Sequence, residues 1–276
     1  MKDVWTPVSF RARPREIELS VPALPAGLDG LRILHIADMH SRRYGRDERC
    51  VREALGGEYD LAVVTGDLCY PPRIRLFAVD LRPVRAAFLD PPANTRLDPK
   101  VKTGLEVADK LFAGLDRPVV AVQGNHDPDL VMEHLAGLGV TVLANNACQV
   151  SVRGGEAVQV VGVRCANRRH TDVAGALARV RGDGFTIALC HYPEYGPALA
   201  QGGAGLVLSG HTHGGQYCLP GGRALLTHSR TGRHFLAGAH RLGQSTLFVS
   251  RGVGASLLPF RTFCPAEVPL LVLRHG

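Results

Sequence analysis

Short apolar runs with the length of a β-strand recur along the chain, and segments of mixed or helical character separate them. Each run is rich in valine, isoleucine or leucine, which is typical of strands buried on both faces of a sheet. The five runs are LRILHIA (31–37), LAVVTG (61–66), PVVAVQG (118–124), FTIALC (185–190) and GLVLSG (205–210). Helical segments are predicted between them, over 50–57, 101–115 and 129–139. This alternation of strand and helix indicates an α/β fold.

Later stretches of the chain alternate apolar and polar residues, as strands with one exposed face do. They are ACQVSVRG, EAVQVVGVR, STLFVSRG and EVPLLVLRH, and they predict a mixed sheet or a second sheet. Residues 1–30 are predicted to form an extended arm that ends in a Pro/Gly-rich segment. The proline-rich stretch over 70–100 is predicted to be a surface excursion. The length of 276 residues suffices for one large domain or two small ones.

Charge narrows the class of partner. The net charge is +7, and arginine supplies all but four of the 32 basic residues. The arginine side chain matches phosphate and carboxylate oxygens with two hydrogen bonds. A basic excess therefore favours an anionic substrate, an anionic membrane surface or nucleic acid. The alternative is that the abundance of arginine reflects coding composition.

Cysteine content and hydropathy indicate the compartment. The seven cysteines are an odd number without a C-x-x-C pair, which argues against a disulfide framework or a zinc ribbon and fits a reducing environment. There is no run of about 18 apolar residues and no apolar core of a signal peptide. We therefore expect a cytoplasmic protein, with at most a weak peripheral contact to the inner face of the membrane. Its oligomeric state is not readable from the sequence.

Residues typical of metal ligands follow each of the five apolar runs. They are Asp38 and His40, then Asp67, then Asn125, His126 and Asp127, then His191, and finally His211 and His213. Because ligands bind beyond the carboxyl ends of strands in open α/β sheets, we expect the five loops to converge. Each motif alone also has a structural interpretation, since a histidine at a strand end is often only hydrogen-bonded and asparagine supports turns. Five such strand ends in one chain favour a metal site.

The ordered motifs D-x-H, G-D, G-N-H-D, H and G-H-T-H resemble those of the calcineurin-like metallophosphoesterase superfamily. The resemblance implies one domain over residues 1–276, built as a four-layer α/β/β/α sandwich of two mixed sheets flanked by helices. It also implies two divalent metal ions at one edge of the sandwich. By resemblance, Asp38, His40 and His213 would hold one ion, Asn125, His191 and His211 the other, and Asp67 would bridge both.

The same resemblance assigns roles to residues around the ions. His126 would face the substrate and Asp127 would orient it. Independently of the resemblance, Arg42 directly follows the first motif and is a candidate for binding a substrate phosphate. Two ions about 3.5–4 Å apart need a bridging carboxylate, and they lower the pKa of a shared water so that hydroxide attacks phosphorus. His126 could then protonate the leaving oxygen. Mn²⁺ is expected first, and Fe, Zn, Ni or Co would also accept these ligands.

The flanking segments extend the resemblance to a bacterial phosphodiesterase branch that includes UDP-2,3-diacylglucosamine hydrolases. They are VPALPAGLDGLRILHIADMHS, LSGHTHGGQYCLP and LFVSRGVGASLLPFRTFCPAEVPLLVLR. The expected reaction is hydrolysis of a phosphodiester or pyrophosphate bond in a small nucleotide-linked or lipid-linked substrate. A nuclease of the same superfamily is an alternative, although only 6% of residues are aromatic and no basic-aromatic stacking stripe is visible. A non-catalytic scaffold is a further alternative, disfavoured because every ligand position holds a competent residue.

Overall fold

The computed structural model describes most of the chain, namely residues 8, 11–70, 98–227, 231, 233–256 and 258–276. Apart from its ends, the surface excursion predicted over 70–100 lies outside the described residues. The same holds for the first part of the predicted N-terminal arm, residues 1–7 and 9–10.

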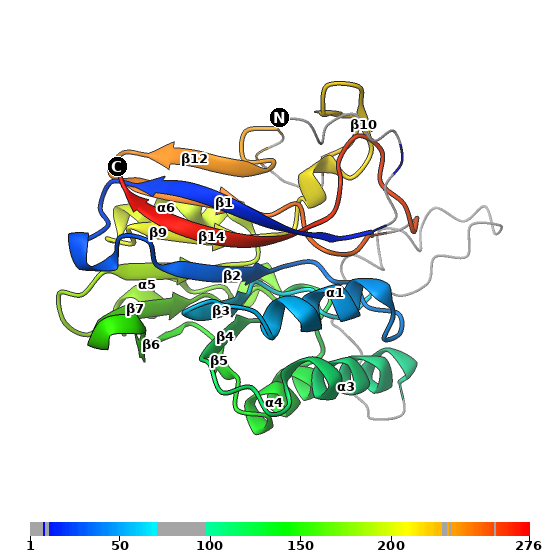
Figure 1. The fold of residues 1–276 in the computed structure, drawn as a ribbon, viewed down its shortest axis with the longest axis horizontal. Coiled ribbons are helices and arrows are strands. Elements are labelled where there is room, and N and C mark those ends of the chain that lie inside the picture. Colours follow the sequence, from blue (N-terminus) through cyan, green and yellow to red (C-terminus); the bar gives the residue numbers. More distant parts are fainter. Residues whose placement is uncertain (1–7, 9–10, 71–97, 228–230, 232, 257) are drawn as a thin grey trace.

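Two six-stranded mixed sheets form the centre of the molecule (Figure 1). The first has the strand order β1-β14-β2-β3-β4-β5 and the second the order β12-β13-β9-β8-β7-β6. The strands of the first sheet are β1 (Arg13–Val21), β2 (Arg32–Ile36), β3 (Leu61–Val64), β4 (Val119–Val122), β5 (Thr141–Leu143) and β14 (Glu267–His275). Those of the second are β6 (Asn146–Ser151), β7 (Ala157–Gly162), β8 (Thr186–Leu189), β9 (Leu206–Ser209), β12 (Gly238–Leu242) and β13 (Ser245–Val249). A short hairpin adds β10 (Cys218–Leu219) and β11 (Arg223–Ala224).

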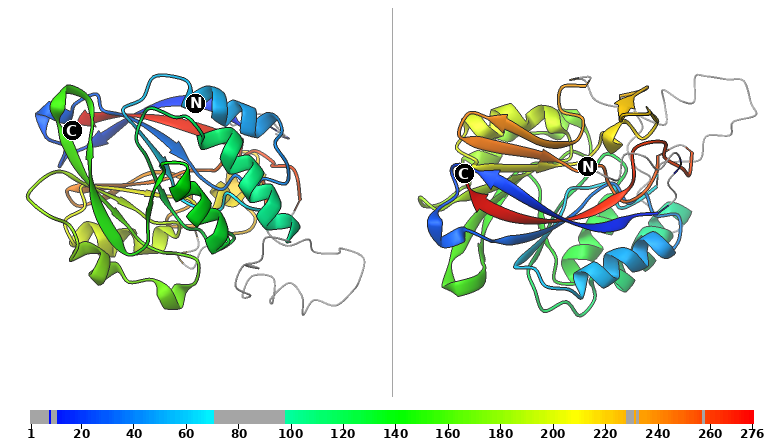
Figure 2. Two further views of the ribbon diagram at one scale, coloured as in Figure 1. Left: turned by 90° about the horizontal axis from the view of Figure 1, so that it is seen from below. Right: turned by 45° about the horizontal axis from the view of Figure 1, so that its top comes forward.

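Helices cover the outer face of each sheet (Figure 2). The helices α1 (Arg46–Leu55), α3 (Pro99–Phe112) and α4 (Asp129–Gly137) pack on the first sheet. The shorter helices α5 (Val173–Leu177) and α6 (Gly196–Gln201) pack on the second. A third apolar cluster fills the space between the sheets. The order of layers is therefore α/β/β/α, which confirms the predicted fold class.

Strand β3 shows why the predicted strands are apolar without alternation. Leu61 and Val63 point toward the second sheet, whereas Ala62 and Val64 point toward the helices on the outer face. All four are at most 2% exposed. A strand with two buried faces has few positions for a polar side chain, so most of the polar residues follow the strand at its end.

The five apolar runs all form strands, and the loops that follow them come from both sheets. Strands β2, β3 and β4 belong to the first sheet, and β8 and β9 belong to the second. The loops therefore meet at the joint edge of two stacked sheets, in agreement with the predicted sandwich.

The N-terminal segment and the first helix differ from what the pattern predicted. Residues 13–21 join the first sheet as β1, which pairs in parallel with β14 over nine residues, so this part of the predicted arm is an edge strand. Helix α1 begins at Arg46, earlier than the predicted 50. The Glu48 carboxylate accepts a hydrogen bond from the Gly45 amide, which satisfies a donor at the helix start and fixes its first turn.

Candidate metal centre

A first group of metal-ligating atoms lies at the ends of β2 and β9. Asp38, His40 and His213 each offer one ligand atom, and these atoms lie within 4.8 Å of one another. His40 Nε2 is 2.9 Å from His213 Nε2. The Nδ1–H of His40 donates to the carbonyl oxygen of Cys69 at 3.1 Å, so its Nε2 presents a lone pair to the group. We call these three residues the first cluster.

A second group lies beside the first and contains Asp67, His191 and His211, whose ligand atoms also lie within 4.8 Å of one another. The Nδ1–H of His191 donates to the Thr65 carbonyl oxygen at 2.9 Å, which directs Nε2 into the group. His191 Nε2 lies 3.0 Å from Asn125 Oδ1, 3.1 Å from His211 Nδ1 and 3.3 Å from Asp67 Oδ2. We call Asp67, His191 and His211 the second cluster; Asn125 lies against it.

Asp67 lies between the two clusters. Its Oδ2 is 3.3 Å from His191 Nε2 and 3.7 Å from His40 Nε2. Its other oxygen accepts a hydrogen bond of 2.8 Å from the main-chain N–H of His126. One carboxylate therefore faces an imidazole from each cluster, and its role as a bridging ligand stays a prediction.

Burial and mutual charge shift the pKa values of these groups. Burial lowers the pKa of His40 to about 3. Burial raises the pKa of Asp38 to about 7, although the neighbouring His191 ring opposes the shift. Burial alone would lower the pKa of His191, but the carboxylates of Asp67 and Asp38 raise it to about 9. Burial also disfavours ionised Asp67, yet the rings of His191 and His126 hold its pKa well below the usual range.

The backbone is strained at most of the cluster residues. Of the six cluster residues, five have a positive φ between 45° and 72°, namely Asp38, His40, Asp67, His211 and His213. Such conformations cost energy and persist where the surrounding structure enforces them. Close packing of the loops does so here, because a Cβ on Gly124 would lie 2.3 Å from Asp67 Oδ1. A Cβ on Gly210 would lie 2.6 Å from Asp38 Oδ2.

The two residues predicted to act beside the ions lie at the centre. The His126 side chain is buried, and its ring lies 5.4 Å from the His40 ring, measured between centroids. The Asp127 carboxylate accepts hydrogen bonds from the main-chain N–H groups of Asp67 (2.7 Å), Cys69 (3.0 Å) and Gly124 (3.0 Å). Asp127 therefore connects the loops after β3 and β4, and its orientation of His126 stays a prediction.

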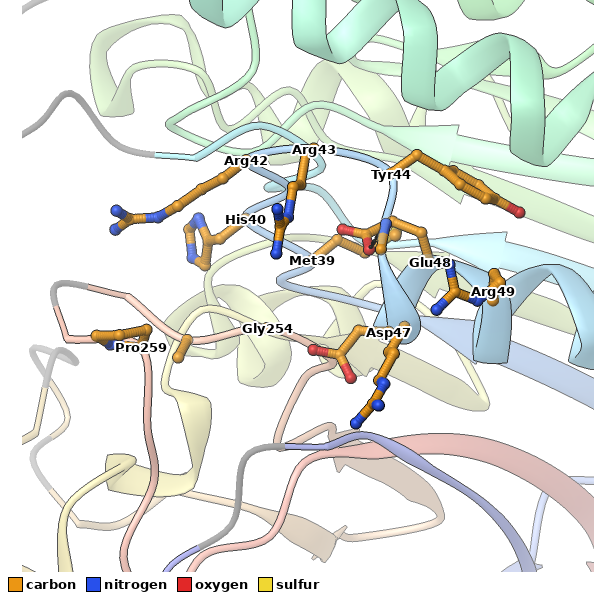
Figure 3. Close-up of a pocket in the computed structure, with 13 residues that line it drawn as sticks. Met39, His40, Arg42, Arg43, Tyr44, Asp47, Glu48, Arg49, Gly254 and Pro259 are labelled. Carbon is orange, nitrogen blue, oxygen red and sulfur yellow. Dashed lines mark hydrogen bonds between the residues drawn. The ribbon is translucent and has the colours of Figure 1, made fainter.

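Arg42 lies at the rim of the centre. Its side chain is exposed, and its guanidinium carbon lies 6.0 Å from the centre of the Tyr70 ring. Together with His40 it lines a cavity that opens beside the first cluster (Figure 3). Its position fits the predicted contact with a substrate phosphate.

Arg261 is a part of the centre that no motif indicated. Its side chain is 2% exposed and lies against the first cluster. The Nε–H donates to the Gly254 carbonyl oxygen at 2.8 Å, and Nη1–H donates to that of His213 at 3.0 Å. Nη2 lies 3.1 Å from His213 Nδ1 and 3.3 Å from the Gly252 carbonyl oxygen. This one guanidinium joins the His213 turn to the loop that follows β13.

Gln216 makes a second connection between the same two loops. It is fully buried, and its side-chain amide donates to the carbonyl oxygens of Ser256 at 2.7 Å and Leu258 at 3.1 Å. Its side-chain oxygen accepts from the Ser256 N–H at 2.8 Å. The loop after β13 is therefore part of the wall of the centre. Gln216 and Arg261 lie in the flanking segments LSGHTHGGQYCLP and LFVSRGVGASLLPFRTFCPAEVPLLVLR that extend the resemblance, but no role was predicted for either residue.

Residues 31–215 match the calcineurin-like phosphoesterase family. The chain is 26% identical to the uncharacterized metallophosphoesterase YkuE of Bacillus subtilis, covering 91% of this chain and 82% of YkuE. It is 31% identical to the phosphodiesterase YaeI of Escherichia coli, over 59% of this chain and 56% of YaeI. A transmembrane protein with a metallophosphoesterase domain from Danio rerio is 27% identical, over 95% of this chain and 57% of that protein.

Among solved structures, the NAD nucleotidase NadN of Haemophilus influenzae aligns with a TM-score of 0.47 and 16% identity, over 82% of this chain and 45% of that chain. In the described part of this chain, no helix has the length and apolar character needed to cross a membrane. The residues of both clusters, with Asn125 and His126, all lie within the matched range 31–215. The chain belongs to the calcineurin-like phosphoesterase family, which uses divalent metal ions, and it is a phosphoester hydrolase.

Proposed function

We propose that the chain is a two-metal phosphohydrolase that cleaves a phosphodiester or pyrophosphate bond in a small nucleotide-linked or lipid-linked substrate. One observation carries the proposal: two clusters of ligand atoms adjoin, and the Asp67 carboxylate lies between them. A single ion would require only one cluster. Two clusters with a shared carboxylate suit a pair of ions.

The donor atoms fit divalent ions of borderline hardness. They are imidazole nitrogens and carboxylate or amide oxygens, which suit Mn²⁺ first and also Fe, Zn, Ni or Co. His40 and His191 both donate Nδ1–H to a main-chain carbonyl. This outer hydrogen bond fixes the tautomer and aims Nε2 at a metal, as it commonly does in metal sites.

The residues around the ions would have distinct tasks. The two ions, when bound, activate water and neutralise negative charge on the phosphoryl oxygens. His126 lies beside the first cluster and would donate a proton or a hydrogen bond to the leaving oxygen. Asp127 would hold the loops that carry Asp67 and Asn125 in register, and Arg42 would bind a substrate phosphate at the rim.

We also infer the setting of the reaction. The apolar cluster shared by both sheets supports a single domain over residues 1–276. The seven cysteines, all without a disulfide, support a reducing cytoplasmic environment. A net charge of +7 would support weak contact with an anionic membrane face where a lipid-linked substrate resides.

The test is a comparison of two chromogenic substrates with the Mn²⁺-loaded protein. We expect metal-dependent hydrolysis of bis(p-nitrophenyl) phosphate in preference to p-nitrophenyl phosphate, with two ions bound per chain. His126→Ala should lower turnover by about 100-fold or more, since general acid catalysis contributes this much. His134→Ala is the matched control, because His134 pairs with Asp109 on the surface of α4. Fewer than two bound ions and no turnover would refute the proposal.

A further inference from the structure

A cavity of about 700 Å³ opens beside the first cluster (Figure 3). Its walls come from the loop that carries His40, from the first turn of α1, and from Gly254, Ala255 and Pro259 on the opposite side. The volume lies within the range of small-molecule binding sites. Because His40 lines the cavity, a substrate held at the metal centre can extend directly into it.

Arginine dominates the polar lining of the cavity. Four arginines line it, namely Arg42, Arg43, Arg46 and Arg49. Figure 3 shows Arg42 and Arg43 on the loop that carries His40, and Arg49 on the adjoining helix. Among the residues that the structure describes, the guanidinium groups of Arg43, Arg46 and Arg49 have no hydrogen bond or ion pair.

The two carboxylates in the lining are used by the local fold. Asp47 accepts a hydrogen bond of 3.0 Å from the main-chain N–H of Ala12. Glu48 is buried and accepts a hydrogen bond of 2.8 Å from the Gly45 N–H. These bonds direct both carboxylates to main-chain donors. Four guanidinium groups against these two carboxylates leave the cavity with a net positive charge, which the N-terminus of the ten-residue helix α1 reinforces.

We propose that this cavity is a second anion subsite, which binds a phosphate group of the substrate in addition to the phosphoryl group held at the metal centre. The proposal rests on the proposed function, since it assumes that the scissile bond lies at the two clusters. Arg43 and Arg46 leave adjacent parts of one short segment and would hold the second phosphate through paired hydrogen bonds. A substrate with a single phosphate leaves these arginines unused. The structure thus points to small substrates that carry at least two phosphate groups.

Direct binding tests the subsite. The probes are AMP and the non-hydrolysable α,β-methylene-ADP, measured by isothermal titration calorimetry with and without Mn²⁺. The proteins are the unmodified chain, the double variant Arg43→Gln/Arg46→Gln, and Arg179→Gln as a matched control. Arg179 is exposed beyond the end of α5, which packs on the second sheet. Thermal unfolding confirms that each variant is folded.

We expect the diphosphate analogue to bind the unmodified protein more tightly than AMP. The ratio of the two affinities should fall by about tenfold in the double variant, as loss of one or two charge-assisted hydrogen bonds would produce. Arg179→Gln should keep the ratio of the unmodified protein. Any direct chelation of Mn²⁺ by the second phosphate is common to all three proteins and cancels in this comparison.

An equal ratio in the double variant and the control would overturn the subsite. So would an unchanged ratio combined with weakened binding to phosphatidylglycerol vesicles, because the arginines would then serve a membrane surface. Failure of the proposed function is a separate result: it appears as fewer than two bound ions together with absent turnover of bis(p-nitrophenyl) phosphate by the unmodified protein. The titrations without Mn²⁺ test the subsite in that case as well.

Discussion

The two clusters of the metal centre differ in how closely the protein encloses them. Asp38, His40 and His213 are at most 4% exposed. In the second cluster Asp67 and His191 are equally buried, but His211 is partly exposed, as is the neighbouring Asn125. All three ligands of the first cluster are therefore buried, whereas the second cluster includes a partly exposed ligand.

The first cluster also has more contacts with surrounding residues that fix its ligands in place. Arg261 donates a hydrogen bond to the main-chain carbonyl oxygen of His213, and its Nη2 lies 3.1 Å from the Nδ1 atom of the His213 ring. A Cβ on Gly254 would lie 1.9 Å from the Met39 carbonyl oxygen, so the loop after β13 packs directly on the backbone beside the first cluster. A rigid and enclosed set of ligands loses little freedom when it binds an ion. We expect the first cluster to bind its ion more tightly, and the second to exchange its ion more readily.

The largest effect is expected from Asp67→Asn, which removes the charge shared by the clusters. Turnover of bis(p-nitrophenyl) phosphate should fall by at least about 10³-fold, because a preorganised electrostatic contact at the reacting centre is lost. Metal analysis should show loss of the ion from the second cluster first, since the first cluster keeps three ligands of its own.

Asp116→Asn is the control for this change. It also removes one negative charge, but Asp116 is exposed near the end of α3. It should keep two ions and full turnover. Two ions and undiminished turnover in Asp67→Asn would show that the clusters are independent and that no carboxylate bridges them.

An intermediate effect is expected from Arg261→Lys, which keeps a positive charge but loses the fork of hydrogen bonds. The affinity of the tighter ion should fall by about 10–100-fold, the usual consequence of removing a partner of a metal ligand. The measurement is a Mn²⁺ titration that resolves the two binding events. At saturating Mn²⁺, the turnover of Arg261→Lys should be closer to that of the unmodified protein than its Mn²⁺ affinity is.

Arg52→Lys is the matched control, because Arg52 also donates to a main-chain carbonyl, that of Leu111, on the outer face of the first sheet. It should leave both affinities unchanged. If Arg261→Lys weakened the second ion instead of the first, the assignment of Arg261 to the enclosed cluster would be wrong.

The pH dependence of metal binding distinguishes the clusters further. His191, with a pKa of about 9, must lose a proton to bind an ion, so affinity at the second cluster should rise as pH increases toward 9. Asp38, with a pKa of about 7, imposes the same requirement on the first cluster only up to about pH 7. His40, with a pKa of about 3, is already neutral over this range and adds nothing.

Mn²⁺ titrations between about pH 6 and 9 measure this difference. One released proton corresponds to about a tenfold gain in affinity per pH unit. The Mn²⁺ affinity of the first cluster should level off above about pH 7, while that of the second cluster continues to rise toward pH 9. Parallel pH profiles for both ions would contradict the assignment of separate titrating ligands to the two clusters.

Strands and ligand positions were predictable where a strand is buried on both faces and its sequence is a continuous apolar run. Strands such as β3 are buried on both faces, so a continuous apolar run followed by a polar motif locates the strand and its carboxyl end together. The division of these strands between two sheets was not readable from the runs, because pairing partners are chosen by tertiary contacts. Strand β5, with three residues, is too short to show a period.

The supports of the first cluster were not predictable for a different reason. Arg261 and His213 are separated by 48 residues, and an arginine that bonds to main-chain carbonyls needs no particular partner side chain. Such a contact leaves no motif in a single sequence. The N-terminal segment was predicted to be extended, but its pairing with β14 depends on residues about 250 positions away.

The position of β14 has a consequence for biosynthesis. This strand lies between β1 and β2 in the sheet although it follows every other described strand in the chain. While the ribosome is still producing the middle of the protein, β1 has no neighbour, and its apolar residues Leu19 and Val21 await their partners. The loop that carries Arg261 emerges only just before β14. The Arg261 support of the first cluster is therefore among the last parts of the centre to be made, and we expect tight binding of an ion at this cluster only after nearly the whole chain has been translated.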